Sequence, residues 1–418
     1  LQGSNPCLSA IYKNLIKVNV RMIAFLFPII SASLIVAVGF GGRQILPLTI
    51  DGITQTTPLD YLTLSLAFAI GQVVWGFANS VGGIIGDKFG NEKALILGIV
   101  LSAVGIALIP HCSSTFEIII CIGLLSAGGS GIAGLAVAMS AVNKRVPSEK
   151  SGLAFGMLNA GGSVGQTFLA PLGVLVILNF GWANALYCLS LLLICTLPFA
   201  YLLKDPNPSE KITQTNEGLG LGETVWLAFC TPSYNYLALG FFTCGFHVAF
   251  IGTHMPGIIA ACGLPPTLSG WSLALIGIFN ILGSLFAGWY ISTRSMKIFL
   301  SAVYFSRAII VIIFLLSPKD TFSILLFSAA VGATYLSTVP PTAALVNRMF
   351  GPKYMATLFG IALFSHQVGG FLGAYFGGYF FNITGEYTLV WFIDIGLALF
   401  AAAIHLPIKE KLVTQASI

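Results

Sequence analysis

The chain has 418 residues, of which 56% are hydrophobic and 8% are charged, and its mean hydropathy is +0.93. Soluble domains carry about 25% charged residues, so this composition excludes a soluble protein and indicates a membrane protein with many spans. The net charge of +5 follows from the membrane topology described below, and it gives no reason to expect a nucleic-acid partner.

Apolar runs of about twenty residues recur from one end of the chain to the other, as they do in transmembrane helices. Twelve helices are predicted, over residues 22–50, 61–81, 92–110, 115–142, 152–179, 182–203, 234–262, 269–292, 297–317, 321–346, 354–381 and 388–407. The sequence therefore predicts an all-α membrane protein that lies in the lipid bilayer.

The distribution of lysine and arginine predicts the orientation, because cytoplasmic loops are enriched in both residues. If both termini are cytoplasmic, the inner segments hold sixteen of the 19 Lys and Arg residues. Lys319 then falls in an outer loop, while Arg43 and Arg307 fall inside helices. We therefore expect cytoplasmic termini, and the short loops favour a bacterial inner membrane.

The helices fall into two related halves. A polar stretch at 204–224 divides them six and six, which predicts an N-terminal bundle over 1–203, a cytoplasmic linker over 204–233 and a C-terminal bundle over 234–418. Residues 153–170 align without a gap with residues 357–374, at an offset of 204. Such parallel repeats are typical of transporters with a substrate site between the halves, and they disfavour a channel.

The segment "GGIIGDKFGNEK" (82–93) joins the second predicted helix to the third. It resembles the loop motif of the major facilitator superfamily, G-x-x-x-D-[RK]-x-G-x-[RK]-[RK]. The matching residues are Gly83, Asp87, Lys88, Gly90 and Lys93. The resemblance implies the major facilitator fold, with twelve helices in two pseudo-symmetric six-helix bundles. We interpret the motif as a conformational latch, since glycines allow close helix contact and an aspartate can cap a helix start.

Residues 151–182, with "GLA", "GGSVG", "LAPL" and a closing "GW", are similar to a helix of the monocarboxylate transporter family and its bacterial organic-anion relatives. Residues 275–288 share the "IGxxxIxxxxxAG" skeleton of that family. The resemblance implies a proton–monocarboxylate symporter that functions as a monomer. Where the family carries an aspartate and an arginine, however, this chain has Asn280 and Ser284.

Arg43 lies within the first predicted helix, where the family places a functional lysine. Its guanidinium offers a rigid fork of donors that fits a carboxylate, and Gly39, Gly41 and Gly42 are predicted to leave open space around it. The alternative is an arginine that reaches the outer lipid headgroups. The proposed ligand is therefore a small organic anion, held by Arg43.

Several histidines could carry a coupling proton, because histidine titrates near neutral pH. His247 and His254 lie seven residues apart on nearly one face of the seventh helix, and His366 lies in the eleventh. Asp394, in the twelfth helix, is a fourth candidate. His247 and His254 could equally bind the substrate as neutral hydrogen-bonding partners, and the alternative for each histidine is a structural role in the core.

Arg307 lies in the middle of the ninth helix, which is normally peripheral in this superfamily. We predict that it forms a structural ion pair with Asp394, and the alternative for these two residues is a proton relay. Uncharged candidates for substrate contact are Asn159, Asn280, Tyr335 and Thr338. Pro340 and Pro341 are predicted to break the tenth helix and to provide a gating bend.

Two readings compete for the substrate. Arg43 and the fifth helix favour a proton-coupled monocarboxylate symporter, while Asn280 and Ser284 favour an exchanger or facilitator for a larger polar metabolite, such as a carboxylate siderophore. Serine motifs at 128–131 and 161–165 resemble those of serine hydrolases, but an enzyme would leave the loop motif unexplained. We therefore expect a transporter without enzymatic activity, cofactor or metal.

Overall fold

The computed structural model describes residues 6–59, 61–205, 219–265 and 267–413. Within these residues, twelve helical segments are long and apolar enough to cross a membrane. This finding confirms the predicted all-α membrane fold. A span in lipid must satisfy the hydrogen bonds of its own backbone, and a helix does so.

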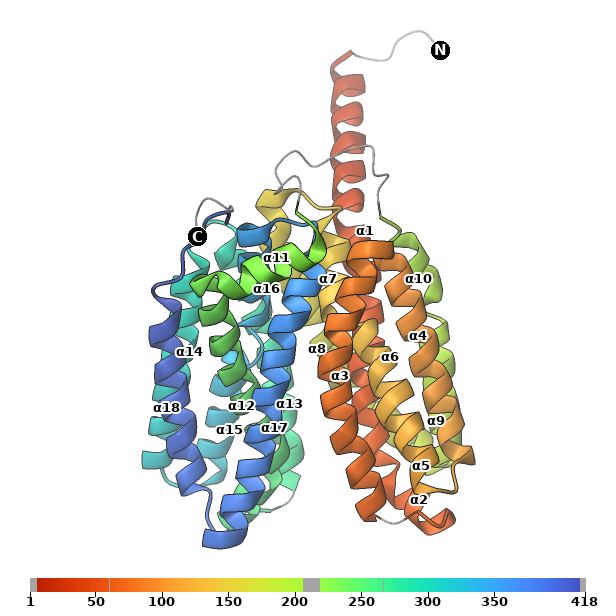
Figure 1. The fold of residues 1–418 in the computed structure, drawn as a ribbon, viewed down its shortest axis with the longest axis vertical. Helices are drawn as coiled ribbons and strands as arrows, with labels where there is room; N and C mark the ends of the chain where they lie inside the picture. The colour runs from red at the N-terminus through yellow and green to blue at the C-terminus, as the bar shows by residue number, and fades with distance from the viewer. Residues whose placement is uncertain (1–5, 60, 206–218, 266, 414–418) are drawn as a thin grey trace.

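Two groups of helices form the two halves of the molecule (Figure 1). The first half contains α1 (Pro6–Leu48), α3 (Tyr61–Phe89), α4 (Asn91–Leu108), α5 (Thr115–Ile118), the π-helix η2 (Ile119–Ser126), α6 (Ala127–Ile132), α7 (Leu135–Asn143), α8 (Ser151–Phe180), α9 (Trp182–Ile194) and α10 (Leu197–Leu202). The second half contains α12 (Pro232–Ala261), α13 (Thr267–Ile291), α14 (Met296–Leu316), α15 (Thr321–Thr334), α16 (Val339–Phe350), α17 (Met355–Thr384) and α18 (Thr388–His405). Short connecting helices are α2 (Ile50–Thr56), η1 (Ile109–His111), η3 (Ser148–Lys150) and α11 (Leu221–Cys230).

Both ends of the described chain lie at the same end of the bundle (Figure 1), which we call the termini end. The opposite end is the far end. Residues 206–218 of the predicted linker fall outside the described residues. The part of the predicted linker that follows contains the helix α11, which places Trp226 and Phe229 on one exposed side and buries Leu227 on the other.

Two of the predicted membrane helices are interrupted in the middle. The fourth stops at Ile132 and resumes at Leu135 as α7, and the tenth stops at Thr334 and resumes at Val339 as α16. The second break lies directly before Pro340 and Pro341, which confirms the predicted break. Gly134 and Thr338, the N-cap residues of α7 and α16, are 204 residues apart, so the breaks occupy equivalent positions of the repeat.

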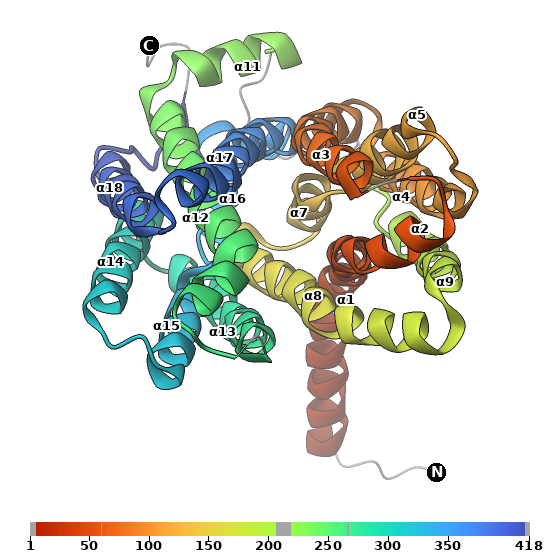
Figure 2. The ribbon, with the colours of Figure 1, turned by 90° about the horizontal axis from the view of Figure 1, so that it is seen from below.

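The two halves meet along two seams, α3 against α17 and α8 against α13; in Figure 2, α8 lies between α1 and α13. Glycines allow a close approach in both seams. A Cβ atom on Gly83 would lie 2.6 Å from the Thr357 backbone nitrogen, and one on Gly156 would lie 2.8 Å from the Gly288 Cα. Both contacts lie toward the termini end of the bundle.

The two halves diverge toward the far end (Figure 1). The α17 face that packs on α3 near Gly360 continues toward the far end as Phe371, Tyr375 and Tyr379, whose side chains are about half exposed. These three rings stack on one another along α17. The two halves are therefore in close contact toward the termini end, and their helices lie farther apart toward the far end.

Candidate functional site

Arg43 lies on α1 and faces α3 of the same half. One terminal nitrogen of its guanidinium donates to the Gln72 side-chain oxygen, and its Cζ lies 4.2 Å from the centroid of the Trp75 ring. None of the ion pairs among the described residues involves Arg43. Its side chain is partly exposed, so a positive charge within a membrane span is available to a ligand without a carboxylate to neutralise it.

The glycines around Arg43 only partly provide the predicted open space. A Cβ atom on Gly39 would meet nothing within 4 Å. A Cβ atom on Gly41, in contrast, would lie 2.6 Å from the Gly165 carbonyl oxygen, and one on Gly42 would lie 3.0 Å from Leu189. The expectation is therefore wrong for Gly41 and Gly42, because α1 packs closely against α8 and α9 there.

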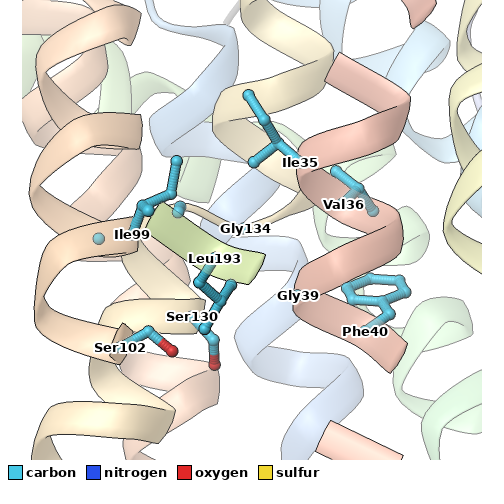
Figure 3. A pocket seen from close by; sticks show the side chains of 11 residues that line it. Ile35, Val36, Gly39, Phe40, Ile99, Ser102, Ser130, Gly134 and Leu193 are labelled. Carbon is cyan, nitrogen blue, oxygen red and sulfur yellow. The ribbon is translucent and has the colours of Figure 1, made fainter. Parts of the chain in front are cut away.

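A small cavity of about 20 Å3 lies beside Gly39 (Figure 3). It is enclosed by α1, by α4 and by the break between α6 and α7. Its lining is mostly apolar, and the hydroxyls of Ser102 and Ser130 donate to the carbonyls of Ser126 and Ala127. That volume holds about one water molecule. The cavity is too small for an organic anion.

Arg307 does not form the predicted ion pair with Asp394. Its side chain is fully buried. One terminal nitrogen of the guanidinium donates to the backbone carbonyl of Thr334 and, at 2.6 Å, to that of Tyr335. These carbonyls end α15, where the last turn of a helix lacks internal donors and carries partial negative charge. Arg307 therefore stabilises the break in the tenth helix, and the prediction of an Arg307–Asp394 pair is wrong.

Asp394 instead pairs with His247. The His247 Nδ1 and Asp394 Oδ2 atoms are 2.7 Å apart, and both side chains are 1% exposed. The pair joins α12 to α18 inside the second half. Sequence reasoning named both residues as proton candidates but did not join them, because 147 positions separate them in the chain.

The other two histidine candidates contact neutral groups. His254 Nε2 donates to the Ala374 carbonyl oxygen at 2.9 Å. His366 Nδ1 lies 3.0 Å from the Gln367 side-chain oxygen. Both residues lie at the contact between α12 and α17, so these contacts fit the structural alternative as well as a proton-handling role.

The uncharged candidates Asn159 and Asn280 meet in the seam between α8 and α13. Asn159 Nδ2 donates to the Ser284 hydroxyl at 2.8 Å, and Asn280 Nδ2 donates to the Ser163 hydroxyl at 2.8 Å. The same two side chains also bind the backbone of Leu336 in the break of the tenth helix, through its carbonyl and its N–H. Asn280 and Ser284, the two α13 positions that differ from the monocarboxylate transporter family, thus form a neutral link to α8 of the other half.

Tyr335 and Thr338 occupy the same break but turn toward α12. The Tyr335 hydroxyl donates to the Val248 carbonyl oxygen at 2.8 Å, and the Thr338 hydroxyl lies 3.1 Å from the Cys244 sulfur. The break therefore contacts α8 and α13 on one side and α12 and α14 on the other. Sequence reasoning missed Ser163 and Cys244, which nothing in the sequence marks as partners.

The loop motif lies at the termini end of the α3–α17 seam. Asp87 Oδ2 accepts hydrogen bonds from the backbone N–H and the hydroxyl of Thr357, both at 2.8 Å. Thr357 lies in the first turn of α17, so Asp87 caps that helix from the other half. Gly90 has a φ of +108°, a conformation that favours glycine, while Lys88 and Lys93 are exposed.

A second link at the termini end was not anticipated. The side-chain amides of Asn143 and Asn347 donate to each other, at 2.9 and 3.2 Å. The residues are 204 positions apart, the offset of the repeat, so this pair lies on the pseudo-two-fold axis. The repeat alignment could have revealed it if it had been extended to α7 and α16.

Comparisons with known proteins agree with this architecture. The model of the Major Facilitator Superfamily matches residues 32–374 and 237–415. The chain is 26% identical over 363 residues to the uncharacterized MFS-type transporter YcxA of Bacillus subtilis, covering 84% of this chain and 87% of that relative. It is 24% identical over 327 residues to monocarboxylate transporter 13 of Rattus norvegicus, covering 77% and 74%.

Among solved structures, the proton:xylose symporter XylE bound to 6-bromo-6-deoxy-D-glucose has the same fold. Its TM-score to this chain is 0.74 at 14% sequence identity, with coverage of 93% of this chain and 97% of XylE. At such low identity the likeness concerns the fold, while the substrate depends on the residues of the site.

Proposed function

The chain belongs to the Major Facilitator Superfamily, and from that premise we propose that it moves a small organic anion of the monocarboxylate kind across the membrane by alternating access, coupled to protons. In this proposal the protein functions as a monomer in a bacterial inner membrane, with the termini end in the cytoplasm. The structure then corresponds to a state that is closed to the cytoplasm.

The observation that carries the proposal is the charge of Arg43. A guanidinium in a span is costly unless a partner compensates it, and the partners of Arg43 are a neutral amide and the face of an indole ring. Gln72 and Trp75 hold the side chain in position without neutralising it. A carboxylate ligand would supply the missing charge and could bind the fork through two parallel hydrogen bonds.

The interrupted helices support an anion site at mid-membrane. In transporters, discontinuous helices at corresponding positions of the two repeats mark the binding site, and N-termini of half-helices favour anions. Here α7 and α16 begin at such equivalent positions. The N–H groups in the first turn of α7 have no partner within their own helix, and this break lies beside Gly39, about one helical turn of α1 from Arg43.

The second candidate is an exchanger or facilitator for a larger polar metabolite, such as a carboxylate siderophore. The observation that favours it is the neutral link formed by Asn280 and Ser284 at positions where monocarboxylate transporters carry charge. A neutral link cannot change its charge during the transport cycle, so it offers no proton coupling of its own.

The test is transport by the purified protein in liposomes, with labelled mono-, di- and tricarboxylates and an imposed inward proton gradient. We expect a monocarboxylate to accumulate, and we expect Arg43→Gln to lower its uptake about ten- to hundredfold, since a charge-assisted hydrogen bond contributes about 1.5–3 kcal/mol. Arg43→Lys keeps the charge and should retain part of the uptake. The matched control is Lys319→Gln, which removes an exposed charge outside the spans.

Uptake that ignores both the gradient and Arg43→Gln would favour the second candidate. It would also return Arg43 to the alternative role of an anchor near the lipid headgroups.

A further inference from the structure

The pair formed by His247 and Asp394 is an unusual feature of the core of the second half. The two side chains lie 2.7 Å apart and are both 1% exposed. Each also has a buried polar atom without a hydrogen-bond partner among the described residues, Nε2 of His247 and Oδ1 of Asp394. Buried ionisable groups in a membrane are costly, and they mark proton and ion pathways.

Other histidines in the described chain have neutral partners. Those partners are the Tyr187 hydroxyl for His111, the Ala374 carbonyl for His254, the Gln367 amide for His366 and the Ala401 carbonyl for His405. Among the described residues, His247 differs from these histidines because its side chain pairs with a carboxylate. An adjacent carboxylate favours the charged imidazolium, and so allows proton uptake in a buried position.

We propose that His247 and Asp394 together hold the proton that is coupled to transport. This inference rests on the proposed function and names the site of its coupling ion. In both protonation states, Nδ1–H of His247 donates to Asp394 Oδ2. The transported proton forms an N–H bond at Nε2, the unpartnered nitrogen, and leaves from the same atom, so one proton is bound and released and no other bond changes.

The surrounding groups explain why a proton and an anion would travel together. Titratable side chains on the elements packed around the pair include Arg307 and Tyr304 of α14, Cys244 of α12, His366 of α17, His405 of α18 and Tyr335 of the break. Arg307 lies on α14, which packs against α18, the helix of Asp394. With Arg307 positive and Asp394 negative, the cluster is neutral when His247 is neutral, and it has a net charge of one when His247 binds a proton.

A net positive charge in the membrane core is unfavourable, and a bound anion relieves it. The break between α15 and α16 connects proton binding with anion binding, because it contacts both the neighbour of His247 and Arg307. The Tyr335 hydroxyl donates to the carbonyl of Val248, the residue after His247, and the Tyr335 carbonyl accepts from Arg307. An anion bound at the level of the breaks would therefore stabilise the protonated pair.

The first test observes the proton directly and needs no substrate. The protein, with 15N-labelled histidine side chains, is placed in lipid nanodiscs, and the five histidines of the chain are titrated by NMR. We expect one Nε2 signal that titrates and that is missing in His247→Gln. In Asp394→Asn the midpoint of this titration should move by about one to three pH units toward lower pH, because the adjacent carboxylate is lost. The control is His405→Gln, which should remove a different signal and leave that titration in place.

The second test uses labelled pyruvate as the probe in liposomes. With one proton per anion, a gradient of one pH unit should drive the wild type to about a tenfold accumulation ratio. His247→Gln and Asp394→Asn should give a ratio near one, while exchange of labelled for unlabelled pyruvate at equal pH continues. Arg43→Gln should lose both activities.

The two tests separate the inference from the proposed function. If pyruvate is not moved at all, the proposed substrate class is wrong, and the NMR titration still decides whether the pair binds a proton. A His247 signal that does not titrate between about pH 4 and 9, or that ignores Asp394→Asn, would overturn the inference. Full accumulation in both variants would do so as well.

Discussion

Arg43 and Arg307 both place a guanidinium within a membrane span, and their surroundings assign them different roles. Arg307 is fully buried and binds the carbonyls that end α15. Arg43 is partly exposed and binds a neutral amide. A buried arginine whose donors point at backbone carbonyls stabilises the fold, whereas a partly exposed arginine without a carboxylate can bind a ligand.

Arg307→Met should therefore destabilise the protein through the break in the tenth helix. The two carbonyls would lose a charged donor, and each such hydrogen bond contributes about 1.5–3 kcal/mol. We expect a lower midpoint of thermal unfolding in detergent, measured by intrinsic tryptophan fluorescence. Arg307→Lys should be intermediate, because a lysine keeps the charge but lacks the fork.

The exchange of charges, Arg307→Asp with Asp394→Arg, should not rescue the single variants. Asp394 pairs with His247, so the exchange would place an arginine against a histidine and an aspartate against two carbonyls. Stability and transport of the double variant are to be compared with those of each single variant. A recovery to the wild-type level would show that Arg307 and Asp394 act as a pair after all.

Residue types alone could not distinguish these roles. The sequence shows that Arg43, Arg307 and Asp394 lie within spans, because apolar runs surround them. It does not show which atom each group faces, since His247 and Asp394 are brought together by the packing of α12 on α18. The prediction paired the two obvious opposite charges, and it failed because backbone carbonyls were not considered as partners.

At the scale of elements, the seams between the halves depend on glycine. Gly83 on α3 and Gly156 on α8 are each in contact with backbone atoms of the other half. The Asp87 side chain adds a charged cap to the N-terminus of α17. These features all lie toward the termini end, so they stabilise one state of the transport cycle more than the other.

Gly83→Val should open the termini end. A Cβ atom at this position would collide with the Ala356 and Thr357 backbone, so the closed seam cannot form without a shift of α17. We expect longer distances between spin labels at Glu149→Cys and Lys353→Cys, two exposed positions in different halves. The control is Gly396→Val on α18, where a Cβ would meet nothing within 4 Å; unchanged distances in Gly83→Val would contradict the role of the seam.

Asp87→Asn should weaken the same closure less severely. The amide oxygen can still accept from Thr357, but the favourable interaction of a negative charge with the N-terminus of α17 is lost, which is about 0.3–1 kcal/mol. The population of the state open at the termini end should therefore rise about two- to fivefold, measured with the same labels. An unchanged population would mean that Asp87 acts within its own loop only.

At the scale of the whole molecule, one pair of side chains joins the two halves at the middle of the termini end. Asn143 and Asn347 bind each other on the pseudo-two-fold axis between α7 and α16. The two seams lie on either side of this pair. Alternating access requires that this link breaks whenever the termini end opens.

A covalent link at this position should stop the cycle. In a variant without native cysteines, Asn143→Cys and Asn347→Cys joined by a short bifunctional thiol reagent should block uptake, and a reductant that cleaves the link should restore it. Each single cysteine treated with the same reagent is the control. Continued uptake by the linked protein would show that the termini end need not open at the axis.

The sequence by itself determined the class of this protein, the twelve spans and the two-fold repeat, because hydropathy, charge asymmetry and a fixed offset are properties of the chain. It also located the break before Pro340, since a proline cannot continue the hydrogen-bond ladder of a helix. Tertiary structure decided the partners: His247 for Asp394, the α15 carbonyls for Arg307, and Thr357 for Asp87. Such contacts depend on how helices that are distant in sequence rotate and pack, which local patterns do not specify.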